Sequence, residues 1–241
     1  MGKGPEKGNF LSACGAVYRL SLNHEEVTMS EKTFSCSDCE TLNCYNREGR
    51  FPQQCIGQAI PHQQIEDVRN LYKSDPLASK LSEAAAEIEG KYYGKLTRVE
   101  EIIAFAQRIN AGKIGVASCV GLASEAKMFV KILDAHGIDS YCTICKVGSI
   151  DKSEIGIAEE SKLRQGCFEG ACNPILQAKL LADQKTGLNV IVGLCVGHDS
   201  MFIKYSQAPV TTLITKDRVL GHNPAAALYT ANSYYKKLLS L

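Results

Sequence analysis

A thiol and an imidazole lie close together in the sequence, just after a short apolar segment. The segment runs from Val190 to Leu194, and its β-branched residues are typical of a strand that is buried on both faces. Gly193 and Gly197 allow a sharp turn, so Cys195 should lie at the carboxyl end of this strand, just ahead of a helix. Open parallel sheets carry their chemistry at this end. If the helix has begun by then, Cys195 and His198 share one of its faces and form a candidate catalytic pair.

Three further cysteines occupy similar places in the chain. Cys119 follows another short apolar segment and precedes a helix, Cys145 lies near the end of a third segment, and Cys172 comes just before a proline. Because the carboxyl ends of parallel strands meet at one edge of a sheet, these three thiols and Cys195 are expected to converge on a cofactor site. Thiols in the first turn of a helix also have lowered pKa values, which favours the thiolate that metals and electrophiles need.

A second group of cysteines lies near the amino terminus. The spacing is C-x2-C-x4-C-x10-C, formed by Cys36, Cys39, Cys44 and Cys55. The segment has few large apolar side chains with which to build a core, so a bound metal is expected to take the place of that core. Zinc held by four thiolates is the first expectation, and an iron–sulfur cluster is the second.

The overall composition restricts the class of protein. The 241 residues include 27 basic and 26 acidic side chains, a balance that gives no global signal for nucleic acid or for an anionic membrane. The eleven cysteines are an odd number and no secretory signal is recognisable, so reduced, metal-binding thiols in a cytoplasm are expected rather than extracellular disulfides. The expected ligand is a small molecule or a metal, and the oligomeric state is left open.

The apolar pattern divides the chain into three parts. Residues 1–30 are expected to be a disordered or non-native extension, residues 31–60 form the cysteine-rich metal-binding segment, and residues 61–241 form an α/β domain with a helical lead-in. The lead-in contains predicted helices from Pro61, from Pro76 and from Thr97. These helices are expected to serve as scaffold.

Short apolar strands alternate with helical segments in the remaining part of the chain. Strands are predicted at residues 114–118, 140–147, 190–194 and 210–215, with helices at 122–136, at 174–185 and from Pro224 to about Leu239. This alternation is typical of βαβ units. The predicted fold class is therefore α/β, a mostly parallel sheet of about four strands flanked by helices, with a small N-terminal cysteine-rich metal knuckle.

Other chemically interesting residues have simpler expected roles. Cys142 and Cys145 form a C-x2-C, but the alternation of a strand sends the two side chains to opposite faces, so Cys142 is assigned to the core. The charged group at residues 216–218 could hold an anionic substrate or, more commonly, form a solvated ion pair. His222 could be a ligand or a capping residue.

Several motifs together resemble a known family. They are the thiol-rich segment from Cys36 to Cys55 and the sequences Cys145-Lys-Val-Gly-Ser, Ala171-Cys172-Asn-Pro, Gly193-Leu-Cys-Val-Gly-His-Asp199 and Lys216-Asp-Arg-Val through His222-Asn-Pro. From about residue 34 to the end, the chain resembles an uncharacterised prokaryotic family of cysteine-rich proteins that are described as metal-binding and occur largely in anaerobes. The resemblance implies a soluble metal-binding protein and no particular reaction.

Three kinds of function follow from these residues. The first is a metalloprotein with an N-terminal zinc or iron–sulfur site and a second, thiolate-lined site at the sheet edge, used in redox chemistry or in handling a metal or sulfur compound. In this hypothesis His198 is a ligand or a proton donor. The second is a thiol enzyme without a metal at the sheet edge, with Cys195 as nucleophile and His198 as its base. The third is a zinc-stabilised module that binds a ligand without catalysis.

Overall fold

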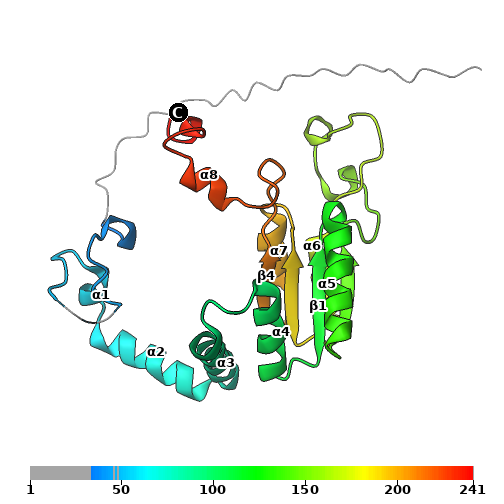
Figure 1. The fold of residues 1–241 in the computed structure, drawn as a ribbon. Coiled ribbons are helices and arrows are strands. Elements are labelled where there is room, and N and C mark those ends of the chain that lie inside the picture. Colours follow the sequence, from blue (N-terminus) through cyan, green and yellow to red (C-terminus); the bar gives the residue numbers. More distant parts are fainter. Residues whose placement is uncertain (1–33, 46, 48, 241) are drawn as a thin grey trace, which may run out of the picture. The chain divides into compact units, whose positions relative to one another are not determined.

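The computed structural model describes residues 34–45, 47 and 49–240 (Figure 1). The extension predicted for residues 1–30 lies outside the described residues. The chain forms two compact units, the first reaching Glu66 and the second beginning at Asp67.

The described part of the first unit contains little regular structure. It has a single 3-10 turn at Cys36–Asp38 and the short helix α1 at Ile56–Ala59, and helix α2 (His62–Ser74) begins in it. Ser35 and Asp38 cap the 3-10 turn, since the backbone N–H of Ser35 donates to Asp38 Oδ2 at 2.9 Å. None of the described residues before position 67 is buried, so this segment has no hydrophobic core within its described part.

The second unit is built on a sheet of four parallel strands in the order β2-β1-β3-β4. This confirms the predicted α/β class. Lys113 is paired with Asp139 at the start of β1 and β2, and the register then continues to the ends of both strands. The strands are β1 (Lys113–Ser118), β2 (Asp139–Ile144), β3 (Leu188–Val192) and β4 (Val210–Ile214).

The helices of the second unit begin where the sequence provides capping groups. The Asp75 side chain accepts hydrogen bonds at the start of α3, Thr97 and Glu100 form the capping box of α4, and Asn173 caps α6. The last predicted helix is shorter than expected, because α8 ends at Tyr229 and gives way to turns. The helices are α3 (Pro76–Tyr92), α4 (Arg98–Arg108), α5 (Ala123–Ala135), α6 (Pro174–Asp183), α7 (His198–Tyr205) and α8 (Ala225–Tyr229).

Helices cover both faces of the sheet (Figure 1). Helix α5 and helix α6 each pack on β1 and β2, α6 also packs on α7, and α4 packs on α3 and β4. The connection from β1 to β2 contains α5, and the connection from β2 back past β1 to β3 contains α6. These two connections run in opposite directions along the sheet, and because both are right-handed, α5 and α6 lie on opposite faces. The core contains Ile114, Val116, Leu122, Phe129, Leu181, Val190, Val192 and Phe202.

The topology creates a switch point between β1 and β3. From β1 the chain passes to β2 on one side of β1, and the next strand, β3, lies on the opposite side of β1. In open α/β sheets, ligands bind outside the carboxyl ends of the two strands at such a point. Gly193 has a φ of 68° and Gly197 a φ of 84°, so the turn after β3 uses both glycines as predicted. A Cβ at position 193 would lie 2.7 Å from Leu122 Cδ2, so the turn packs closely on the segment that follows β1. Among the helices of the described residues, none combines the length and the apolarity that a membrane crossing needs.

Candidate functional site

Three of the four cysteines predicted at the sheet edge lie together. Cys119 follows β1, Cys145 follows β2 and Cys172 lies two residues before α6. The Cys145 thiol interacts with both Cys119 and Cys172, and these interactions shift the pKa values of the thiols. Cys119 and Cys145 are buried, whereas Cys172 is partly exposed. We call these three residues the thiol cluster.

The thiol cluster has a donor in the middle and an acceptor at one end. The hydrogen bond from Cys145 lowers the pKa of Cys172 to about 5, and the ammonium group of Lys146 contributes further. The same hydrogen bond, together with burial, raises the pKa of Cys145. At neutral pH, Cys172 is therefore a thiolate and Cys145 keeps its proton.

A lysine that is distant in the sequence lowers the pKa of the Cys119 thiol. Burial acts to raise the pKa of this thiol, but the hydrogen bonds from the Lys216 ammonium and the Gly121 backbone N–H outweigh that effect, so the pKa of Cys119 is lowered. The distance from Lys216 Nζ to Cys119 Sγ is 2.6 Å. The backbone N–H of Val120 donates to Cys145 Sγ at 3.3 Å. The turn after β1 thus supplies backbone donors to two sulfur atoms of the thiol cluster.

The shared helical face on which the expected pairing of Cys195 with His198 was based is missing from this turn. Helix α7 begins only at His198, so Cys195 lies outside the helix and the two side chains do not share a helical face. The Cys195 sulfur accepts a hydrogen bond from Arg218 Nη2 at 3.0 Å. His198 instead contributes electrostatically to the lowered pKa of Cys172.

The charged group after β4 contacts the thiols. Lys216 and Arg218 donate to the sulfur atoms of Cys119 and Cys195, so the expected solvated ion pair is not what these side chains form. Sequence reasoning did not assign Lys146, Lys216 and Arg218 to thiols. The available signal was their position, since Lys146 and Lys216 lie two residues and Arg218 four residues beyond strand ends that share the carboxyl edge of the sheet.

Asp217 and His222 stabilise the turn that carries these cations. The Asp217 carboxylate accepts the backbone N–H of Val219 at 2.9 Å and of Leu220 at 2.8 Å. His222 has a φ of 66°, and its Nδ1 accepts the backbone N–H of Asp217 at 3.1 Å. Of the two roles expected for His222, the structure shows the structural one.

The assignment of Cys142 to the core is wrong. Cys142 is exposed, because β2 is an edge strand with a single neighbouring strand. The strand also ends at Ile144, which is earlier than predicted, so Cys145 lies in the following turn and the alternation of a strand does not apply to the C-x2-C pair. Cys167 is exposed as well.

The N-terminal cysteines lie at the surface of their segment. Cys36 and Cys44 are exposed, and Cys39 and Cys55 are partly exposed. Backbone N–H groups of Leu42 and Thr41 donate to the Cys39 sulfur and lower the pKa of this thiol. Across the described ranges of both units, no three or more His, Cys, Asp or Glu side chains are already arranged to hold a metal ion.

The comparisons with known proteins place the chain in a family. The family described as "Protein of unknown function (DUF1847)" matches residues 55–213, which contain the thiol cluster, Cys195 and His198. "Uncharacterized protein MJ0455" from Methanocaldococcus jannaschii is 47% identical over 204 residues, which cover 85% of this chain and 97% of that protein. No solved structure matches the chain. The resemblance to an uncharacterised, cysteine-rich prokaryotic family is thus confirmed, and the chain belongs to the DUF1847 family.

Proposed function

We propose that the thiol cluster is a binding site for a thiophilic metal, either zinc or the iron of an iron–sulfur cluster, in a protein of a reducing cytoplasm. The observation that supports this proposal is the convergence of three thiols from three separate loops, with Cys145 interacting with both of the others. A dithiol redox site needs only two of them. A third thiol from a distant strand end is expected when the sulfurs share one central group.

The donor chemistry of the thiol cluster suits such a metal. Thiolates select zinc and iron–sulfur clusters, and two of the three sulfurs already have lowered pKa values. The backbone N–H groups of Gly121 and Val120 supply the hydrogen bonds to sulfur that tune thiolate ligands. Cys145 has to lose its proton on binding, so metal affinity should rise with pH.

Cys195 and His198 are the proposed accessory residues. Cys195 lies after β3 at the switch point and would be a further thiol ligand for a cluster, and His198, which interacts electrostatically with Cys172, would be a ligand or proton donor. A bound iron–sulfur cluster would supply electron transfer, and zinc would supply Lewis acidity. The site would then act in redox chemistry or in handling a metal or sulfur compound.

A second metal site is proposed for Cys36, Cys39, Cys44 and Cys55. The absence of buried residues in the described part of this segment leaves it without a hydrophobic core, and a structural metal supplies the missing folding free energy in such segments. The backbone hydrogen bonds to the Cys39 sulfur support a thiolate there. Zinc is the simplest occupant, because structural zinc sites are commonly formed by four cysteines.

Anaerobic purification of the full chain, followed by elemental analysis and a visible spectrum, tests these proposals. Cys119→Ser and Cys172→Ser should each abolish metal at the sheet edge while circular dichroism stays native. Cys142→Ser is the matched control, since this exposed thiol lies outside the cluster, and it should keep the wild-type metal content. Unchanged metal content in both cluster variants would refute the sheet-edge site. If zinc is lost only when Cys36, Cys39, Cys44 or Cys55 is replaced, the result would favour the third hypothesis, a zinc-stabilised module that binds a ligand without catalysis.

A metal-free thiol enzyme is the second candidate, and the hydrogen bond between Cys145 and Cys172 favours it. The Cys172 thiolate would attack a substrate disulfide, form a mixed disulfide and release one substrate thiolate. That thiolate takes the Cys145 proton, and the Cys145 thiolate then attacks Cys172 Sγ to release the second substrate sulfur as a thiolate, which takes a proton from water. The products are a Cys145–Cys172 disulfide and a reduced substrate. A Cys145–Cys172 disulfide that forms in glutathione buffer, in protein without sheet-edge metal, would support this candidate over the first.

A further inference from the structure

A cavity opens beside the thiol cluster in the long connection between β2 and α6. Its volume is about 420 Å³, within the range of small-molecule sites. Lys146, Arg164 and Phe168 line it, together with Leu163 and Glu169. We call it the side cavity.

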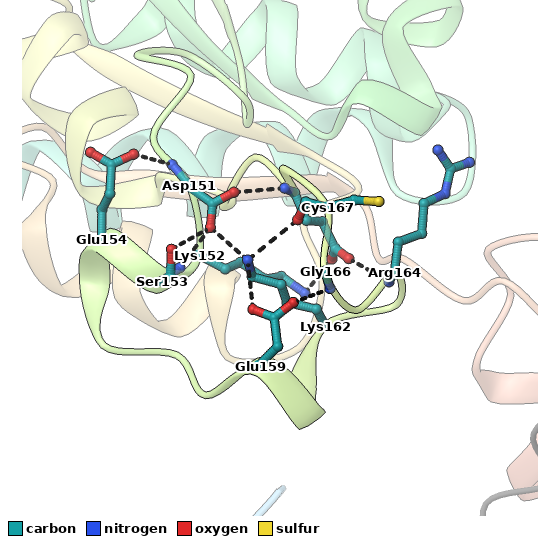
Figure 2. A network of polar contacts seen from close by, with 10 residues as sticks. Asp151, Lys152, Ser153, Glu154, Glu159, Lys162, Arg164, Gly166 and Cys167 are labelled. Carbon is teal, nitrogen blue, oxygen red and sulfur yellow. Dashed lines mark hydrogen bonds and ion pairs between the residues drawn. The ribbon is translucent and has the colours of Figure 1, made fainter.

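The charges of the side cavity are unequal. Lys146 and Arg164 are cations, whereas the Glu169 carboxylate already forms an ion pair with Lys152 and accepts the backbone N–H of Arg164 at 3.1 Å. Figure 2 shows the Arg164 guanidinium extending away from this network. Within the part of the chain that the structure describes, no carboxylate forms an ion pair with that guanidinium. The cavity therefore presents positive charge to a ligand.

The walls of the side cavity are fixed by a buried ion pair. Lys162 Nζ lies 2.9 Å from Asp151 Oδ1 and 2.9 Å from Glu159 Oε2, and its side chain is only 5% exposed (Figure 2). Asp151 also accepts the backbone N–H of Glu169 at 2.8 Å. The network joins both ends of the connection, so the cavity is held open by the fold itself.

One cation connects the side cavity with the thiol cluster. The Lys146 ammonium donates to the Gly170 carbonyl at 2.5 Å and also helps to lower the pKa of the Cys172 thiol. Phe168 is 64% exposed and Leu163 is 92% exposed, so apolar surface borders the two cations. A ligand that satisfies all of these groups carries an anionic end and an apolar part.

We infer that the side cavity binds a small organic anion, a carboxylate or phosphate with an apolar substituent, and holds it next to Cys172. This inference deepens the proposed function, because it assigns a substrate class to the thiol cluster. The anion would lie between Lys146 and Arg164, with its apolar part against Phe168.

Calorimetry with phenyl phosphate and the full chain as purified tests this inference. Arg164→Gln should weaken binding by about tenfold or more, because a charge-assisted hydrogen bond is lost. Lys131→Gln is the matched control, since Lys131 is an exposed cation on α5 that does not line the cavity, and it should bind phenyl phosphate like the wild type. Benzyl alcohol, which is neutral, should bind more weakly than phenyl phosphate, and its affinity should be the same in the wild type and in Arg164→Gln.

The outcomes separate this inference from the proposed function. Absent binding of phenyl phosphate, or equal affinity in the wild type and Arg164→Gln, would overturn the inference while leaving the metal content of the protein unaffected. Equal weakening by Lys131→Gln would also overturn it, because net charge would then explain the effect. Normal phenyl phosphate binding in a protein without sheet-edge metal would refute only the metal proposal.

Discussion

Lys216 donates a hydrogen bond to the Cys119 sulfur at 2.6 Å, although 97 residues separate them in the chain. Lys216 follows β4 and Cys119 follows β1, and β3 lies between these two strands. The contact therefore passes across the carboxyl end of β3, at the switch point of the sheet. A Cβ added to Gly121 would lie 3.4 Å from Lys216 Nζ, so the ammonium is enclosed by the turn that carries the thiol.

Replacing Lys216 with Gln should raise the pKa of Cys119, because the variant loses the positive charge and the charge-assisted hydrogen bond to the sulfur. In a pH titration of the ultraviolet thiolate absorbance of the reduced, metal-free chain, the ionisation of Cys119 should then move to higher pH. Lys216→Arg keeps the charge and a donor and should show a much smaller shift. An unchanged titration in Lys216→Gln, or an equal shift in Lys131→Gln, would show that Lys216 does not set this pKa.

Gly115 is required by close packing in the centre of the sheet. An added Cβ would lie 2.1 Å from Asn189 Oδ1 and 2.8 Å from Leu181 Cδ1, so β3 and α6 would both have to move. Gly115→Ala should reduce the free energy of unfolding by about 1–3 kcal/mol, as overpacking does. The measurement is denaturant unfolding followed by circular dichroism.

Gly90 supplies the matched control for Gly115. It lies in α3 and no atom approaches its added Cβ within 4 Å, so Gly90→Ala should raise the free energy of unfolding by up to about 1 kcal/mol through helix propensity. Destabilisation by both substitutions, or by neither, would contradict the packing explanation.

The fold was predictable because its signals are local. The strands at 114–118 and 190–194 overlap β1 and β3, and the proline at position 174 marks the start of α6 as expected. Local patterns also place Cys119 and Cys172 at element ends. The parallel topology then brings these thiols to a single edge without further information.

The electrostatics of the site were not predictable from local patterns. Lys216 and Arg218 are adjacent to Asp217 in sequence, which favours an ion pair, but in the fold their side chains reach the sulfurs of Cys119 and Cys195. Such contacts depend on the order of strands in the sheet, which one sequence does not specify. The exposure of Cys142 was missed for the same reason, since only the strand order makes β2 an edge strand.

The N-terminal cysteine-rich segment should lose stability when Cys39 is replaced. Cys39→Ser weakens the proposed metal ligation, so the metal content should fall and amides of the segment should exchange faster with solvent. A chelator should reproduce this local loss of protection in the wild type while the amides of β1 and β3 stay protected. Hydrogen exchange with mass spectrometry measures both effects. Unchanged metal content and exchange in Cys39→Ser would leave the segment without a metal-dependent structure.

The hydrogen bond from Cys145 should control the reactivity of Cys172. A thiol reacts as its thiolate, so in the reduced, metal-free chain Cys172 should be alkylated by iodoacetamide at a nearly constant rate until the pH falls through its pKa of about 5. Cys145→Ala removes the donor, so the pKa of Cys172 should rise toward its ordinary value. The rate near neutral pH should then fall by about tenfold or more, because most of the thiol is protonated.

Cys145→Ser separates this effect from a simple loss of packing. Its hydroxyl can still donate to the Cys172 sulfur, so it should restore part of the rate, whereas alanine should not. Peptide mass spectrometry resolves the alkylation of each cysteine, and exposed Cys167 serves as the internal reference because it lies outside the thiol cluster. Identical pH profiles for Cys172 in the wild type and in Cys145→Ala would exclude Cys145 as the donor, and the low pKa would then have to come from Lys146.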